Sequence, residues 1–143
     1  MAFSAKTEYG LVALIDLADA YASGGLVQTG EICRRHQIPE RYLEQMLTSL
    51  RKGGLLRSIR GPKGGFQLAR DPSAITVVEV VTCLEGEAGS ETSKRKSDAE
   101  FAVLAALDAK AEQARNAVLS ALSLADLVRE RDGARAPLPM FYI

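Results

Sequence analysis

The sequence predicts a mainly helical fold that contains one small β-hairpin and ends in a long helix. Apolar residues recur at steps of three and four in several segments, which is the periodicity of amphipathic helices. A Gly/Pro-rich turn lies between two short strand-like runs and predicts the hairpin. With 143 residues, of which 47% are hydrophobic and 25% charged, the chain has the composition of a globular protein with one modest core.

Three helices are predicted in the first third of the chain. Ser4 can cap the first helix, which we expect over residues 5 to about 22, where a pair of glycines follows. Thr29 can cap a short second helix over about residues 30–36. The third follows a three-residue turn and covers about residues 39–52, with its leucines facing inward.

A hairpin and a fourth helix come next. The strands are expected at residues 55–59 and 66–70, on either side of the Gly/Pro-rich turn. Thr76 and Glu79 form a capping box that opens a helix ending near residue 84. One helix, two helices joined by a tight turn, a hairpin and another helix make the plan of a winged helix-turn-helix domain.

The composition divides the chain into three parts. Residues 1–85 form the predicted winged helix-turn-helix domain. Residues 86–97 contain no apolar residue larger than alanine and are expected to be a flexible linker. Residues 98–143 comprise a long dimerisation helix to about residue 121, a short helix over residues 124–131 and a tail.

The long helix carries an apolar stripe that its own domain is too small to cover. Its 24 residues span about 36 Å, whereas a domain of 85 residues is only about 30 Å across. We therefore expect a symmetric homodimer, and the alternative is a helix folded back over its own domain. The stripe consists of Leu104, Leu107, Ala111, Ala114, Val118 and Leu122.

Positive charge is concentrated in one segment of a chain whose net charge is zero. Residues 34–70 carry nine basic and two acidic side chains, a net charge of +7. A basic segment of this kind predicts a face that binds a polyanion, and the alternative is an ordinary solvated surface.

Six short motifs, in the same order, resemble the Rrf2 family of bacterial transcription regulators over nearly the whole chain. They lie at residues 4–11, 42–47, 50–55, 60–66, 75–81 and 123–128. The resemblance implies a winged helix-turn-helix on a long dimerisation helix, which binds double-stranded operator DNA as a homodimer. It also implies that the third helix enters the major groove and the hairpin turn enters the minor groove.

Carried over to this sequence, the resemblance assigns ten candidate DNA contacts. The base-reading candidates are Arg41, Tyr42, Glu44 and Gln45. The minor-groove candidates are Arg60, Gly61 and Lys63. The phosphate-contact candidates are Lys6, Thr29 and Arg51.

Simpler roles remain open for several of these residues. Tyr42 could pack on the first helix, Glu44 could pair with Arg41 within the third helix, and Arg51 could be an ordinary solvated charge. Gln37 stands where many helix-turn-helix turns have glycine, and it is strained if its backbone is left-handed.

The sequence departs from the cluster-binding members of the family. These carry three closely spaced cysteines in the segment that matches residues 86–105, where this chain has none. Its cysteines are Cys33 and Cys83, and the one histidine, His36, is expected at the surface. We therefore expect no cofactor and no metal, since an iron–sulfur cluster needs about four donors. The alternative is a cluster assembled across a dimer from Glu8 and Cys83.

The sequence predicts a sequence-specific repressor and not an enzyme, because no catalytic arrangement surrounds the histidine. One alternative is a signal-relay protein that binds a metabolic enzyme through the apolar tail at residues 140–143; a small-molecule effector also remains open. Another alternative is a thiol switch at Cys33 or Cys83. The apolar runs are too short for a transmembrane helix and no signal peptide is evident, so a cytoplasmic location is expected.

Overall fold

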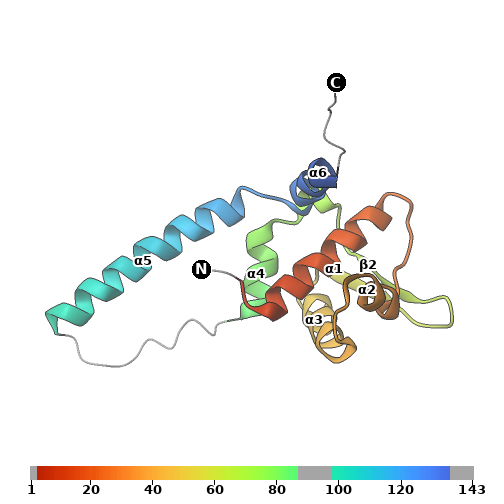
Figure 1. Ribbon diagram of the computed structural model, residues 1–143, viewed down its shortest axis with the longest axis horizontal. Coiled ribbons are helices and arrows are strands. Elements are labelled where there is room, and N and C mark those ends of the chain that lie inside the picture. The colour runs from red at the N-terminus through yellow and green to blue at the C-terminus, as the bar shows by residue number, and fades with distance from the viewer. Residues whose placement is uncertain (1–2, 87–97, 136–143) are drawn as a thin grey trace, which may run out of the picture.

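The fold is mainly helical with one two-stranded antiparallel hairpin, as the sequence predicts (Figure 1). The structure is a computed structural model that describes residues 3–86 and 98–135. Apart from Gly86, the predicted linker lies outside the described residues, and so does the apolar tail at residues 140–143.

The first three helices are α1 (Ala5–Tyr21), α2 (Thr29–His36) and α3 (Glu40–Lys52). The Ser4 hydroxyl accepts a hydrogen bond from the Thr7 amide and caps α1, as predicted. The cap expected at Thr29 is wrong: this residue is the first of α2, and Gln28 occupies the cap position without a side-chain hydrogen bond to the helix. The helix therefore begins one residue earlier than the pattern indicated.

The hairpin pairs β1 (Leu56–Ile59) with β2 (Gly65–Leu68). The amides of Val27 and Phe66 each donate to the other residue's carbonyl at 2.9 Å, so the segment before α2 extends the hairpin. A side chain at Gly65 would place its Cβ 2.7 Å from the Val27 carbonyl oxygen, which explains the glycine there. No local sequence pattern predicts this second pairing.

The remaining elements are η1 (Pro72–Ala74), α4 (Val77–Glu85), α5 (Ala99–Ser120) and α6 (Leu124–Arg135). The predicted capping box of Thr76 and Glu79 is present with both of its hydrogen bonds. Ser123 and Asp126 form a second reciprocal pair of this kind at the start of α6. Helix α6 runs four residues beyond the predicted end at residue 131.

The core surrounds α1 and receives residues from both ends of the chain. Leu14, Leu43 and Leu47 are fully buried, and Leu119 and Leu124 join the same cluster. The C-terminal segment is tied to the segment before α4, because the Leu124 amide donates to the Ile75 carbonyl at 3.0 Å. We call residues 3–86 together with α6 the head, and α5 the arm.

The arm projects away from the head (Figure 1), and its C-terminal half approaches the start of α1 and the end of α4. Leu104, Leu107 and Val118 keep 58%, 61% and 61% of their surface exposed. Ala111 and Ala114 are exposed too. Leu122 does not belong to this stripe, contrary to the prediction: it lies two residues beyond the end of α5 and packs half-buried against the core of the head.

Candidate nucleic-acid interface

A tight turn joins α2 to α3. Gln37 has the left-handed backbone that the sequence left open, with φ 56° and ψ 46°. Its amide and that of Ile38 both donate to the Cys33 carbonyl, and the Ile38 side chain is buried. Pro39 then occupies the position before the first residue of α3, so only three residues separate the two helices. This is the geometry of a helix-turn-helix unit, in which the second helix is free to meet DNA.

Helix α3 has one buried and one exposed face. Its inner face consists of Leu43, Met46, Leu47 and Leu50, none of them more than 5% exposed. The outer face carries the predicted base-reading residues Arg41, Tyr42, Glu44 and Gln45, all of them exposed. Tyr42 keeps 42% of its surface exposed, and among the described residues no ion pair joins Arg41 to Glu44. Both side chains of that pair are available to a ligand.

Four of the ten candidates line one open groove. Lys6 at the start of α1 lies across from Arg41, Glu44 and Gln45, around a space of about 630 Å³. Thr48, Ser49 and Leu84 line the same groove. The two hydroxyl residues were missed from the sequence, although they follow Glu44 and Gln45 by four residues and so share their helix face.

The hairpin presents a second group of candidates. Arg60, Gly61 and Lys63 are all exposed at its turn, and Gly61 has a φ of 112° that favours glycine. Arg51 is exposed in the last turn of α3. Thr29 is half-buried at the start of α2 and, like Arg51 and the hairpin residues, does not line the groove.

The basic segment at residues 34–70 divides into structural and available charges. Arg35 lies 3.3 Å from the Asp16 carboxylate, Arg57 donates to the Ala69 carbonyl, and Arg70 lies 2.7 Å from the Glu79 carboxylate. No described residue accepts a hydrogen bond from Arg41, Arg51, Arg60 or Lys63. The four basic residues of this segment that were predicted to meet DNA are therefore among its cations without a described protein partner, together with Arg34 and Lys52.

Both cysteines are poor thiolates. Burial raises the pKa of the Cys33 thiol, and the nearby carboxylates of Glu40 and Glu44 raise it further. Burial also raises the pKa of Cys83, whose Sγ donates to the Ser49 carbonyl at 3.3 Å. Because the thiolate is the reactive form, this environment disfavours the thiol switch considered from the sequence.

A winged helix-turn-helix with a polar, exposed second helix and a basic hairpin beside it defines a DNA-binding transcription regulator. The comparisons with known proteins agree. A family model described as Rrf2, an iron-dependent transcriptional regulator, matches residues 3–130. The chain belongs to the Rrf2 family, as its motifs indicated.

Named relatives support the same class. The chain is 33% identical to the HTH-type transcriptional regulator CymR of Bacillus subtilis, over the full length of both chains. The structure of CymR from B. subtilis superposes with a TM-score of 0.74, covering 91% of this chain and 98% of that one. The structure of T. potens IscR has a TM-score of 0.81 at 34% identity, covering 97% of this chain and 94% of the other.

Other relatives are matched over only part of their length. Identity to the HTH-type transcriptional regulator IscR of Cereibacter sphaeroides is 44%, over 59% of this chain and 56% of the relative. The chain likewise spans 55% of two putative regulators from Mycobacterium tuberculosis. About half of each of these relatives has its counterpart here.

The residues of this chain do not fit an iron–sulfur cluster. The sequence holds two cysteines and one histidine. Cys83 is directed at α3. His36 is half-buried at the surface, and its Nε2 lies 2.8 Å from the Asp16 Oδ2, a contact that the sequence did not indicate. Within the described ranges, no three ligating side chains come together.

No described helix is both long and apolar enough to cross a bilayer.

Proposed function

We propose that the protein represses transcription by binding a specific operator as a homodimer, through α3 in the major groove and the hairpin in the minor groove. The observation that carries this proposal is the outer face of α3, where Arg41, Glu44 and Gln45 meet Lys6 of α1 around one groove. These side chains supply both donors and acceptors for base edges, and the lysine supplies a charge for a phosphate.

The arm supports the dimeric part of the proposal. Leu104, Leu107, Ala111, Ala114 and Val118 follow one another at alternating steps of three and four, and all are exposed. A second copy of the same stripe is the simplest cover for it, and a two-fold dimer would present two α3 helices to a palindromic operator.

The proposal is tested by separating base reading from charge. Gln45→Ala should weaken binding to the operator by about 1–3 kcal/mol and leave binding to random DNA unchanged, because no phosphate charge is lost. Lys63→Ala should weaken binding to both DNAs and reduce the slope of log affinity against log salt by about one. Arg60→Ala should do both if its guanidinium enters a narrow minor groove.

Affinities of the three variants are measured on operator and non-operator DNA at several salt concentrations, with the operator found by genome-wide mapping of bound sites. Equal proportional losses for Gln45→Ala on the two DNAs would show that α3 does not read the bases. Deletion of the gene should raise transcription from the bound promoters, and a fall instead would identify an activator. Because the proposed operator is chromosomal DNA, we also propose a cytoplasmic location.

We further propose that the protein works without an iron–sulfur cluster and without enzymatic activity. The support is the donor set: two cysteines with raised pKa values and a histidine held by Asp16. The protein purified without oxygen should be colourless. Stoichiometric iron and sulfide would overturn this proposal, and loss of both in Glu8→Ala would then favour the cross-dimer cluster.

A further inference from the structure

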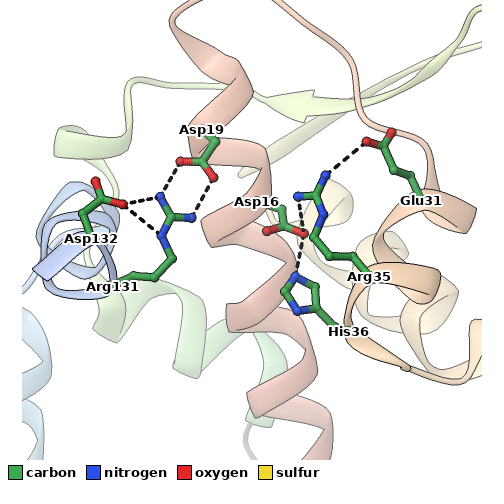
Figure 2. Close-up of polar contacts among 7 residues, drawn as sticks. All are labelled: Asp16, Asp19, Glu31, Arg35, His36, Arg131 and Asp132. Atoms are coloured by element: carbon green, nitrogen blue, oxygen red, sulfur yellow. Dashed lines mark hydrogen bonds and ion pairs between the residues drawn. The ribbon is translucent and has the colours of Figure 1, made fainter. Parts of the chain in front are cut away.

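Helix α1 carries two carboxylates three residues apart that serve opposite sides of the molecule (Figure 2). Asp19 faces α6, where both oxygens lie 2.7 Å from the guanidinium nitrogens of Arg131. Asp16 faces α2 on the other side and is only 4% exposed. The two side chains therefore differ in burial and in the element that each one holds.

Asp16 is held by two donors from the last turn of α2. Its Oδ2 lies 2.8 Å from His36 Nε2 and 3.3 Å from Arg35 Nη1 (Figure 2). Arg35 is fixed on its other side by Glu31, whose Oε2 lies 3.3 Å from Nη2. We call Asp16, Glu31, Arg35 and His36 the α1–α2 polar cluster.

Fold stability alone does not account for this cluster. Burying a carboxylate carries a large desolvation cost, and a pair of apolar side chains would hold α2 against α1 at least as well. Unlike apolar packing, two directional contacts to one oxygen hold the last turn of α2 in a single orientation. The cluster is thus suited to positioning.

The last turn of α2 leads directly into α3. Gln37 and Ile38 both donate their amides to the Cys33 carbonyl, so the turn is bonded back onto α2. The Gln37 backbone is left-handed, a conformation that a residue with a side chain keeps only when its surroundings hold it there. Any rotation of this end of α2 is passed on to the start of α3, where Arg41 stands two residues after Pro39.

We propose that Asp16 is a positioning residue for DNA recognition: through His36 and Arg35 it fixes the end of α2, and so the angle at which α3 presents its base-reading face. The proposal rests on the proposed DNA-binding function. Asp16 itself is buried and needs no contact with DNA. Its loss should reduce discrimination between DNA sequences more than general attraction to DNA.

The test compares Asp16→Asn with Asp19→Asn in the full-length protein. Asp16→Asn keeps the shape and one acceptor oxygen but removes the negative charge that binds Arg35 and His36, so operator affinity should fall about tenfold while affinity for random DNA changes less than about twofold. Asp19→Asn removes a carboxylate from the same helix without touching α2, and both affinities should stay within about twofold of wild type. The ratio of the two affinities is the readout, because partial unfolding lowers both equally.

A second pair of variants separates hydrogen bonding from packing. His36→Gln keeps an N–H donor at a similar reach and should retain the operator preference, whereas His36→Leu should lose it as Asp16→Asn does. The inference would be overturned if Asp16→Asn and His36→Leu left the ratio of operator affinity to random-DNA affinity unchanged, whether both affinities fall equally or neither falls. If the wild-type protein itself showed no operator preference, the proposed function would fail instead. Should Asp16→Asn not fold, the His36 pair decides the question alone.

Discussion

The head and the arm differ in the burial of their leucine side chains. In the head, leucines such as Leu14, Leu43 and Leu47 are fully buried against one another. In the arm, Leu104 and Leu107 keep about three-fifths of their surface in contact with solvent. The head has completed its core within one chain, whereas the arm has apolar surface that its own chain does not cover.

The end of the arm nearest the head shows where this difference begins. Leu119 is buried in the core, and Arg115 pairs with Glu85 at 3.4 Å while its guanidinium lies 5.6 Å from the centre of the Phe3 ring. From Val118 outward, the apolar residues of the stripe are exposed. Contiguous exposed apolar surface of this kind is typical of an interface. This contrast supports the proposal that the head is a folding unit and the arm an assembly unit.

The largest expected effect is loss of the dimer on charging the stripe. Leu107→Asp combined with Val118→Asp should give monomers by light scattering, because two carboxylates would face their symmetry mates in the interface. Operator affinity should fall by about 10²- to 10⁴-fold, as the two half-sites are no longer bound by linked copies. The matched control is Ala102→Asp with Ala109→Asp, which adds the same charges on the far side of α5. Unchanged mass in the first variant would show that the stripe is not the interface.

A smaller effect is expected from truncating one leucine in each region. Leu47→Ala in the head should lower the free energy of unfolding by about 2–5 kcal/mol, since it leaves a cavity in a packed core. Leu104→Ala in the arm should change it by less than about 0.5 kcal/mol, as for other surface positions. Both are measured by urea denaturation in the monomeric double variant, where unfolding does not depend on association. Similar losses at the two positions would contradict the division into folding and assembly units.

Local patterns predicted the elements, and tertiary contacts decided what the sequence missed. Ser4, and Thr76 with Glu79, act as helix caps because capping depends on residues three apart. The Val27–Phe66 pairing joins segments 39 residues apart in the chain, and no local pattern marks it. Leu122 fits the helical period of the stripe, but its carbonyl accepts a hydrogen bond from the Val77 amide, which takes it out of the helix.

The site shows the same division. The outer face of α3 follows from helical spacing and from the family resemblance, and the structure places Arg41, Glu44 and Gln45 there. His36 could not be assigned from the sequence, since its partner Asp16 lies 20 residues away on another helix. Whether the ten candidates touch DNA stays a prediction.

The smallest expected effect is a loss of head stability at low pH. The carboxyl groups with lowered pKa values all lie there; they are Asp19, Asp71, Glu79 and Asp126. For Asp19 the first cause is the hydrogen bond from Arg131, which ties α6 to α1. A carboxyl group whose pKa is lower in the folded state stabilises the fold above its unfolded pKa, and this contribution is lost as the pH falls through the folded value.

Wild-type head stability should therefore decrease as the pH falls below about 4, the ordinary range of an aspartate. Because the Asp19–Arg131 pair is partly exposed, its share should be at most about 1 kcal/mol. Asp19→Asn should be less stable than wild type at pH 7 by that amount, and the two stabilities should converge as Asp19 of the wild type becomes protonated. Urea denaturation of the monomeric double variant, with and without Asp19→Asn, measures the difference from pH 7 to pH 3. A difference in stability that stays constant over this range would mean that the Asp19 side chain holds α6 by packing and not by charge. The attachment of α6 to the head would then depend on apolar contacts, such as those of the buried Leu124.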